Sequence, residues 1–418
     1  MQYGLIGEKL GHSYSKEIHT VFGKYDYELK ELPKDQVKSF ILGKQFKGLN
    51  VTIPYKETVM EFLDFIDEEA KAIGAVNTVV NKDGKLYGYN TDFYGMLEVL
   101  KDTGFDFTNK KVLILGVGAT AKTATAVMNH LRVKKIIYAA RNKAKSFNIE
   151  KTVSFDEAKE KLTDVDFIVN TTPCGMYPNF DDQAIDLTPF KNIYGVFDVI
   201  FNPGRTKLML QAESLGKKAY GGLKMLVYQA VYAAEKFTGE SVERNLSEKV
   251  LKDLRSKNEN IVLIGMPASG KSTVGKILSK DLKKEFYDTD NLIVKKAGCE
   301  ITDIFKDKGE TYFRDLESEV IKEVSLKKNV IIATGGGAIL RKENVEALKA
   351  YGRLYFIDRA LENLLPTDDR PLANDAEKIK KLYETRLPIY KEAADVIVEC
   401  DNVLEHKVEK IKRDHYEH

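Results

Sequence analysis

The stretch Ile261-Val-Leu-Ile-Gly265-Met-Pro-Ala-Ser-Gly270-Lys271-Ser272-Thr273 determines how the C-terminal part of this chain folds. Its four apolar residues are typical of a buried strand, and they run directly into the pattern GxxxxGK(S/T) and a helical sequence. In such a loop the backbone amides hold nucleotide phosphates, the lysine reaches the β- and γ-phosphates, and the hydroxyl binds Mg²⁺. The sequence therefore predicts a nucleotide and magnesium site with these contact residues: Gly265, Ala268, Ser269, Gly270, Lys271, Ser272 and Thr273.

Carboxylates, glycines and arginines follow this loop in the sequence. The next predicted strand ends in Asp288-Thr289-Asp290, and both carboxylates face one side because side chains alternate along an extended segment. One of them can then serve the metal while the other reaches an acceptor hydroxyl. Further on, Gly335–Gly337 ends another strand and exposes backbone amides. A single arginine is usually surface charge, but several behind a P-loop indicate ligands for an anionic substrate. These arginines are Arg314, Arg370 and Arg386.

A second strand, glycine-rich loop and helix lie in the first half of the chain, in the sequence KVLILGVGATA. Gly116 is expected to make the tight turn, Gly118 to let the backbone approach a pyrophosphate, and Ala121 to allow close helix–strand packing. Alone such a loop is weak evidence, because a plain strand–helix turn can look the same. The next strand, however, ends in the cations Arg141 and Lys145 instead of the acid that selects NAD, so NADP is the expected cofactor. The alternative is that both cations only cover a solvated strand end. The candidate cofactor ligands are Gly116, Gly118, Ala119, Thr120, Ala121, Arg141 and Lys145.

The composition of the chain excludes several classes of protein. Its 418 residues are 43% hydrophobic and 31% charged, and strand-like runs alternate with helical patterns, which indicates an α/β fold of two or three domains. Lys and Arg number 65 against 63 Asp and Glu, a balance that argues against a nucleic-acid partner. No apolar run approaches the ~20 residues of a membrane span, and the first residues do not look like a signal peptide. Three distant cysteines indicate neither a disulfide framework nor a metal cluster, so we expect a soluble, cytoplasmic protein.

Polar clusters are spread along the first 240 residues, and each one alone is typical of a turn or a helix cap. Together, seven segments resemble the shikimate dehydrogenase family in content and order: HSYSKEIH (12–19), NVTIPYK (50–56), GAVNTVV (74–80), GYNTDFYG (88–95), GVGATAK (116–122), NTTPCGM (170–176) and GGLKMLVYQA (221–230). The resemblance implies a substrate-binding lobe, a Rossmann lobe that binds NADP, and a helix that returns to the first lobe. It also implies the reversible reduction of 3-dehydroshikimate to shikimate by NADPH.

The same resemblance implies that Lys56 and Asp92 are the catalytic pair. Hydride transfer to a ketone creates an alkoxide that needs a proton donor and a nearby positive charge, and a lysine ammonium supplies both. Two positions depart from the family: Lys16 replaces a proline, and Phe201 stands where relatives commonly have a tyrosine, which puts one substrate contact in doubt. The implied substrate ligands are Ser13, Ser15, Thr52, Asn77 and Gln229.

Residues 259–415 resemble the shikimate kinase family in the order and spacing of the P-loop, carboxylates, glycines and arginines. This implies a parallel-sheet, nucleoside-monophosphate-kinase-like domain that transfers the γ-phosphate of ATP to the 3-hydroxyl of shikimate. Asp288 would hold Mg²⁺ with the P-loop serine, Asp290 would orient the attacking hydroxyl, and Arg370 would close a lid on the phosphates. The segment Leu364-Leu365-Pro366-Thr367 departs from relatives, which often place an arginine near the adenine there. The implied substrate ligands are Arg314, Gly336, Gly337 and Arg386.

The sequence therefore predicts a bifunctional enzyme of consecutive reactions, acting on small molecules, without nucleic-acid or membrane partners. The expected boundaries are a substrate lobe at 1–101 completed by 224–245, a Rossmann lobe at 102–223, a linker at 246–258 and the P-loop domain at 259–418. Two alternatives stay open: the substrates are quinate or another small hydroxylated acid, or one half is catalytically silent and regulates the other. The oligomeric state is also open.

Overall fold

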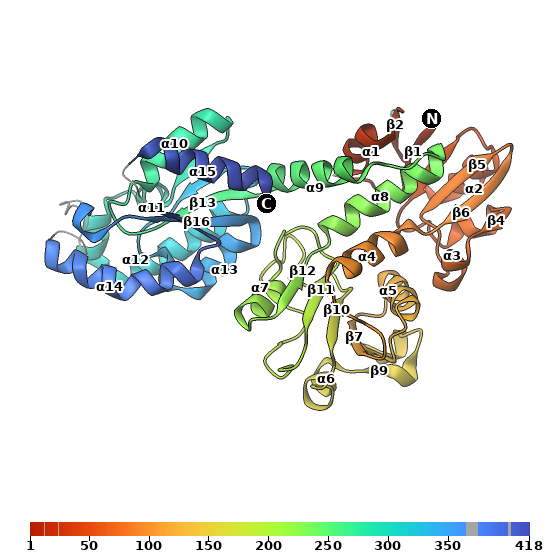
Figure 1. Cartoon of the computed structure of the whole chain (residues 1–418), viewed down its shortest axis with the longest axis horizontal. Helices are drawn as coiled ribbons and strands as arrows, with labels where there is room; N and C mark the ends of the chain where they lie inside the picture. Colours follow the sequence, from red (N-terminus) through yellow and green to blue (C-terminus); the bar gives the residue numbers. More distant parts are fainter. Residues whose placement is uncertain (12, 24, 365–374, 400–402) are drawn as a thin grey trace. The chain divides into compact units, whose positions relative to one another are not determined.

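The computed structural model describes residues 1–418 except 12, 24, 365–374 and 400–402, and it contains two compact units (Figure 1). The first unit comprises Met1–Asn202 and Leu208–Leu251, and the second comprises Pro203–Lys207 and Lys252–His418. Within the described residues, no helix is both long enough and apolar enough to cross a bilayer.

The first unit opens with a mixed six-stranded sheet of order β2-β1-β3-β5-β6-β4. β1 pairs in parallel with β2 and β3, whereas β5 runs antiparallel to β3 and β6. The strands are β1 (Tyr3–Gly7), β2 (Tyr27–Glu31), β3 (Gly48–Val51), β4 (Phe65–Ile66), β5 (Thr78–Lys82) and β6 (Lys85–Tyr89). Its helices are α1 (Ser15–Gly23), α2 (Lys34–Leu42), α3 (Glu68–Ile73) and α4 (Thr91–Asp102), with a 3₁₀ turn η1 (Thr58–Phe62).

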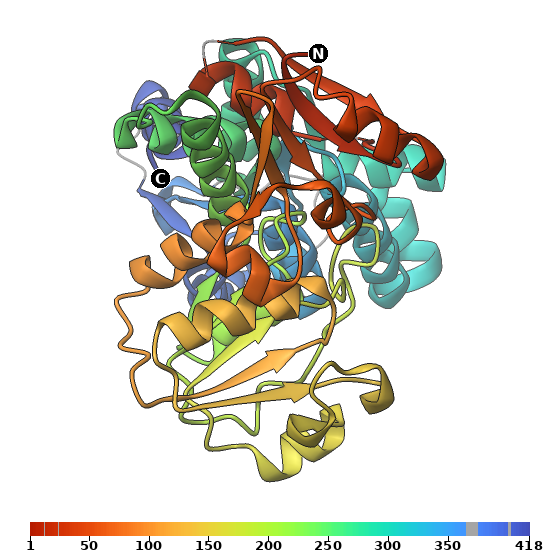
Figure 2. The same ribbon diagram turned by 90° about the vertical axis from the view of Figure 1, so that its right-hand side faces the viewer.

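A parallel six-stranded sheet of order β12-β11-β10-β7-β8-β9 follows, with helices on both faces (Figure 2). Val112 and Ile114 of β7 pack under α5, while Leu113 and Leu115 face the other core, so this strand is apolar on both sides as parallel strands usually are. The strand order turns back between β7 and β10, the position where such sheets bind cofactors. The elements are β7 (Lys111–Leu115), α5 (Ala119–His130), β8 (Lys135–Ala139), η2 (Lys143–Lys145), η3 (Ile149–Lys151), β9 (Thr152–Val153), α6 (Phe155–Lys161), β10 (Phe167–Asn170), β11 (Gly195–Asp198), α7 (Lys207–Ser214) and β12 (Lys218–Tyr220).

The chain then returns to the first sheet through α8 (Leu223–Thr238), which packs against α4 and α1. α4 and α8 touch at Gly95, where a Cβ atom would lie 2.7 Å from the backbone oxygen of Met225 and 3.0 Å from the nitrogen of Gln229. Only glycine fits this crossing. Helix α9 (Arg244–Asn258) comes next and contains the segment 246–258 that was expected to be a linker.

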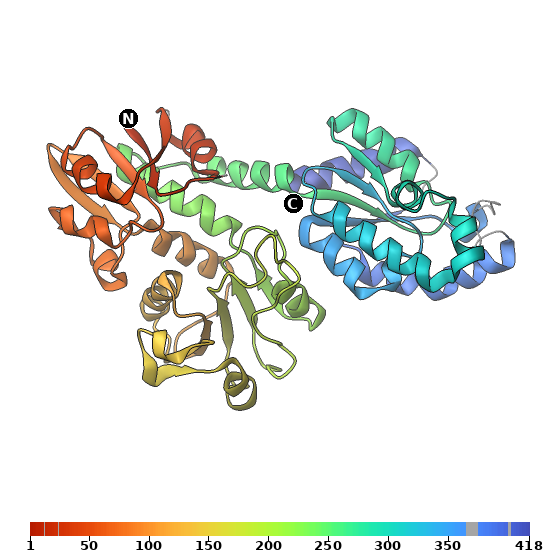
Figure 3. The same cartoon turned by 180° about the vertical axis from the view of Figure 1, so that it is seen from behind.

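The second unit holds a parallel five-stranded sheet of order β14-β15-β13-β16-β17 between two layers of helices (Figure 3). Every residue of β13 is buried, as predicted from its apolar run. The two parallel, helix-covered sheets confirm the predicted α/β class. The elements are β13 (Asn260–Ile264), α10 (Lys271–Leu282), β14 (Phe286–Asp288), α11 (Thr289–Ala297), α12 (Ile301–Ser325), β15 (Ile331–Ala333), η4 (Ala338–Leu340), α13 (Lys342–Tyr351), β16 (Gly352–Asp358), η5 (Leu361–Asn363), α14 (Ala376–Ala393), β17 (Val396–Glu399) and α15 (Leu404–Glu417).

Candidate active sites

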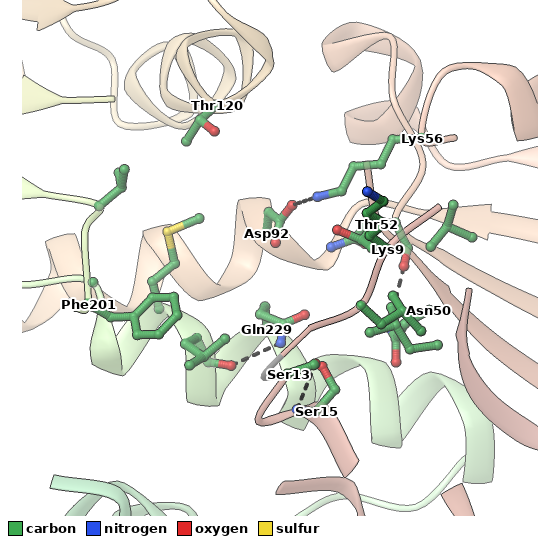
Figure 4. A pocket seen from close by; sticks show the side chains of 18 residues that line it. Lys9, Ser13, Ser15, Asn50, Thr52, Lys56, Asp92, Thr120, Phe201 and Gln229 are labelled. Atoms are coloured by element: carbon green, nitrogen blue, oxygen red, sulfur yellow. Dashed lines mark hydrogen bonds and ion pairs between the residues drawn. The ribbon is translucent and has the colours of Figure 1, made fainter. Parts of the chain in front are cut away.

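A cavity of about 380 Å³ lies in the first unit, between the loop after β1, the end of β3, and the helices α4, α5 and α8 (Figure 4). The structure gathers around it all seven residues assigned to substrate binding and catalysis in the first half: Ser13, Ser15, Thr52, Lys56, Asn77, Asp92 and Gln229. Thr120, from the first turn of α5, lines the same cavity and so brings the glycine-rich loop next to it.

Lys56 and Asp92 form an ion pair in this cavity, with Lys56 Nζ donating to Asp92 Oδ2 at 2.6 Å (Figure 4). About a quarter of each side chain is exposed, 25% and 22%, so both remain within reach of a ligand. Asp92 lies in the first turn of α4, where the positive end of the helix dipole stabilises its negative charge. Asn90 caps that turn by accepting from the backbone nitrogen of Phe93.

A buried hydrogen-bond network fixes the floor of the cavity. Asn77 Oδ1 accepts from the backbone nitrogen of Thr91 at 2.7 Å and from Thr78 Oγ1 at 3.0 Å. Asn50 donates to Thr78 Oγ1 at 3.0 Å and accepts from the Tyr27 hydroxyl at 2.7 Å. Because buried polar groups with satisfied partners hold a single geometry, this network positions the cavity residues before any ligand arrives.

Lys9 also lines the cavity and was not singled out from the sequence. It belongs to the loop between β1 and α1 that also carries Ser13, and this is the signal that could have identified it. Together with Lys56 it gives the cavity two ammonium groups against the single carboxylate of Asp92, so the cavity carries a net positive charge. Phe201 also lines the cavity, and its ring offers no hydroxyl to a substrate. Lys16, the other position that departs from the family, is exposed on α1.

The glycine-rich loop fits a dinucleotide. Gly116 has φ 101°, and a Cβ atom there would lie 2.8 Å from Thr171 Oγ1, so the turn requires glycine. Nothing lies within 4 Å of a Cβ position at Gly118, and α5 begins there without a side-chain cap. Free helix N–H groups beside open space suit a pyrophosphate. Arg141 is exposed directly after β8, and Lys145 lies in η2.

The P-loop of the second unit has the backbone that phosphate binding requires. Gly265, Ala268 and Gly270 all have positive φ, at 151°, 63° and 93°, and Lys271 begins α10 directly after them. Lys271 Nζ, almost completely buried, donates to the backbone oxygen of Gly265 at 2.9 Å and to that of Met266 at 2.8 Å.

Ser272 and Asp288 meet beside this loop, with the serine hydroxyl donating to Asp288 Oδ2 at 2.6 Å. Hydroxyl and carboxylate oxygens are ligands that Mg²⁺ accepts, so the pair fits the predicted metal. The strand ends at Asp288, and Asp290 lies in the first turn of α11, so the prediction that both carboxylates extend from one strand was wrong. Asp288 caps this helix by accepting from the backbone nitrogen of Asp290 at 3.1 Å, which keeps the two residues next to one another.

The other residues that were predicted to bind an anionic substrate converge on the glycine run Gly335–Gly337. A Cβ atom at Gly335 would lie 2.7 Å from Asp290 Oδ1, and one at Gly337 would lie 2.1 Å from Arg314 Nη1. Arg386 Nη1 donates to the backbone oxygen of Gly336 at 3.0 Å. Arg314 and Arg386 are 8% and 5% exposed, which makes a purely surface role untenable.

Glu317 is a further member of this group that the sequence analysis overlooked. It is completely buried and accepts from Arg314 Nη1 at 2.7 Å. Burial raises the pKa of its carboxyl, and the neighbouring Arg314 opposes that rise. Residues three positions apart on a helix are neighbours, so the spacing of Arg314 and Glu317 could have indicated this ion pair. Arg370, predicted to close the lid, lies outside the described residues, as do Leu365, Pro366 and Thr367.

Both units are similar to known proteins. The model of the family "Shikimate dehydrogenase substrate binding domain" matches residues 5–79, and that of the family "Shikimate kinase" matches residues 267–414. The NADP(+) shikimate dehydrogenase of Clostridium perfringens is 39% identical over 268 residues, which cover 61% of this chain and 98% of the relative.

Solved structures match the first unit. A chorismate mutase/shikimate 5-dehydrogenase fusion protein from Clostridium acetobutylicum has a TM-score of 0.58 at 35% identity, covering 61% of this chain and 97% of that one. Quinate dehydrogenase from Corynebacterium glutamicum in complex with NAD has a TM-score of 0.55 at 28% identity, covering 60% and 98%.

Proposed function

This chain belongs to the shikimate dehydrogenase family and carries a shikimate kinase domain behind it, and we propose that it catalyses two consecutive reactions. The first is the reduction of 3-dehydroshikimate to shikimate with NADPH, and the second is the phosphorylation of shikimate to shikimate 3-phosphate with ATP. The observation that carries the first is the cavity that holds the Lys56–Asp92 pair and a residue of the dinucleotide loop together.

In the first reaction, bound NADPH supplies the hydride. Lys56 Nζ then gives a proton to the oxygen of the reduced carbonyl, and Asp92 holds this lysine in place. The substrate's carboxylate and hydroxyls are held by hydroxyl and amide groups of the cavity: Ser13, Ser15, Thr52, Asn77 and Gln229. Gly116, Gly118 and the N-terminus of α5 accommodate the pyrophosphate, while Arg141 and Lys145 recognise the 2′-phosphate.

In the second reaction, bound Mg-ATP supplies the phosphoryl group. Lys271 and the amides of the P-loop hold the phosphates, and Ser272 and Asp288 hold the metal. Asp290 orients the 3-hydroxyl of shikimate, and Arg314 and Arg386 bind its carboxylate beside the amides of Gly336 and Gly337. Arg370 completes the charge neutralisation of the phosphates. Positioning and charge account for most of the rate in this chemistry.

We also propose the domain boundaries and the setting. The substrate lobe is 1–101 with 224–245, the Rossmann lobe 102–223, the connection 246–258 and the kinase domain 259–418. Cys174 and Cys299 are free thiols, which suits the reducing cytoplasm, where NADPH and ATP are available. Small molecules are then the partners of this enzyme, without nucleic acid or membrane.

Product analysis tests both activities at once. The enzyme is mixed with 3-dehydroshikimate and NADPH, with and without Mg-ATP. We expect shikimate without ATP and shikimate 3-phosphate with it. Shikimate in both mixtures would contradict the kinase assignment, and unchanged NADPH would contradict the dehydrogenase assignment. Oxidation of quinate with NADP, compared with that of shikimate, tests the alternative substrate, and we expect shikimate to react faster.

A further inference from the structure

Tyr390 of α14 lies between the proposed nucleotide and acceptor sites of the second unit. The sequence analysis gave this residue no role in either site. Its side chain is completely buried and stacks on Phe356, with ring centroids 5.0 Å apart and an angle of 7° between the planes. Its hydroxyl contacts two backbone oxygens, that of Gly265 at 2.9 Å and that of Gly336. Gly265 is the first residue of the P-loop, and Gly336 belongs to the glycine run beside the proposed acceptor site.

Each of these two oxygens also binds a cation. Lys271 Nζ donates to the oxygen of Gly265 at 2.9 Å, and Arg386 Nη1 donates to the oxygen of Gly336 at 3.0 Å. A continuous chain of hydrogen bonds therefore connects the lysine that the nucleotide needs with the arginine that the acceptor needs. Its members are Lys271, Gly265, Tyr390, Gly336 and Arg386.

The hydroxyl of Tyr390 has one proton for two acceptors. Burial raises the pKa of this phenol, with the Arg386 guanidinium opposing the rise, and the hydroxyl stays protonated at any working pH. The proton can serve only one backbone oxygen at a time. A buried oxygen that loses its cation therefore needs the proton more than one that keeps it.

We propose that Tyr390 is a positioning residue that couples nucleotide binding to acceptor binding in the kinase domain, by giving its proton to whichever backbone oxygen has lost its cation. This rests on the proposed function, because phosphates must draw Lys271 from Gly265 and a carboxylate must draw Arg386 from Gly336. When one ligand binds, Tyr390 covers the oxygen left behind. When both ligands bind, both backbone oxygens have lost their cations and the single proton of Tyr390 can serve only one of them. The other oxygen stays buried without a donor, and this costs binding free energy for the second ligand but not for the first.

Replacement of Tyr390 by phenylalanine keeps the buried ring and removes the shared proton. In Tyr390→Phe of the full chain, whichever ligand binds first leaves an oxygen without a donor, and its Kd rises roughly five- to tenfold. The second ligand meets the same penalty in the variant as in the wild type, so its Kd is unchanged. The probes are shikimate and a non-hydrolysable ATP analogue with Mg²⁺, each titrated by calorimetry alone and with the other at saturation. Shikimate that binds in the cavity of the first unit is fitted as a separate site, which Tyr390→Phe leaves unchanged.

Tyr355→Phe is the matched control. Tyr355 is also completely buried in the second unit, but its hydroxyl donates to Asp414 Oδ2 at 2.9 Å and contacts neither loop. We expect it to lower the unfolding temperature without changing any of the four Kd values. Equal weakening of each ligand by Tyr390→Phe with and without the other would show a merely structural role, and no weakening at all would also overturn the proposal. Because shikimate also binds the cavity of the first unit, a wild type that binds only one shikimate per chain would instead contradict the proposed kinase function.

Discussion

The proposed dehydrogenase chemistry depends on Lys56. Its ammonium is paired with one carboxylate at 2.6 Å, and a quarter of the side chain still faces the cavity. Because the ammonium group is already held in position, the protein does not have to rearrange when a negative charge develops on the substrate oxygen beside it. The pair therefore acts on the transition state more than on the bound ground state.

Replacement of Lys56 by methionine tests this role. We expect kcat for shikimate oxidation to fall about 10²–10⁴-fold while KM changes little, because the proton donor is lost and the hydroxyl and amide ligands remain. NADP reduction followed at saturating shikimate measures the change. Lys101→Met is the control, since Lys101 also pairs with a carboxylate, Glu98 at 3.2 Å, but on the exposed face of α4. A normal kcat with a raised KM would show that Lys56 only binds substrate.

The residues that the sequence predicted for the two sites belong to short motifs, whereas the residues that it missed have partners far away along the chain. Lys56, Asp92, Lys271 and Asp288 stand in local patterns whose chemistry is recognisable without the fold. Tyr390, in contrast, contacts oxygens 125 and 54 residues away, which no spacing in the sequence reveals. Lys9 lies in a loop whose path over the cavity depends on tertiary packing.

At the scale of elements, the crossing of α4 and α8 sets the width of the first cavity. α4 carries Asp92 and α8 carries Gln229, and both line the cavity. Gly95 lets the two helices touch, since a Cβ atom there would lie 3.0 Å from the backbone nitrogen of Gln229. The distance between Asp92 and Gln229 therefore depends on the absence of a side chain at Gly95.

Gly95→Val should push α8 away from α4. We expect a loss of roughly 1–3 kcal/mol of unfolding free energy from overpacking, together with a raised KM for shikimate because Gln229 moves. Urea unfolding and steady-state kinetics measure the two effects. Lys101→Val, on the exposed face of the same helix, should cost only a few tenths of a kcal/mol and leave KM unchanged. Wild-type stability and KM in Gly95→Val would refute the tight crossing.

The polar segment 246–258 shows why composition alone misses an element. Its many charged residues predict a linker but give no sign of the helix α9, which contains this whole segment. Val250, Leu251 and Leu254 are buried at helical spacing, and this narrow apolar stripe stabilises the helix. The strands of the two parallel sheets were easier to predict, because residues buried on both faces form continuous apolar runs.

At the scale of the whole molecule, each unit buries a neutral histidine. Burial lowers the pKa of His19 in the first unit to about 3 and that of His415 in the second unit to about 4. His19 lies parallel to Tyr27, with centroids 4.2 Å apart, and its Nδ1 meets the Tyr25 hydroxyl at 2.8 Å. His415 contacts Lys284 and lies 3.9 Å from Glu259.

These histidines make both units sensitive to acid. An unfolded histidine takes up a proton below pH 6.5, whereas the folded ones do so only near their lowered pKa values, so stability falls as the pH drops through this window. In His19→Gln, the first unit's urea transition should lose less free energy between pH 6.5 and about pH 3 than in the wild type. An unchanged slope in His19→Gln would contradict this account.

Each unit contains all the described residues that we propose for its own site, so the two activities should be separable in the intact chain. We expect Lys56→Met to retain full kinase activity and Lys271→Met to retain full dehydrogenase activity. Labelled shikimate added during turnover of 3-dehydroshikimate should enter shikimate 3-phosphate in proportion to its share of the pool. Exclusion of the label from the product would show that the intermediate passes between sites without release.

The return of α8 to the first sheet also has a consequence for biosynthesis. α4 must pack against a helix that the ribosome makes only after the entire second sheet, at Leu223–Thr238. The apolar side of the first lobe therefore stays uncovered while the nascent chain grows through the Rossmann strands. Translation that stalls within those strands leaves the apolar surface under α8 exposed, and exposed apolar surface makes such fragments prone to aggregation.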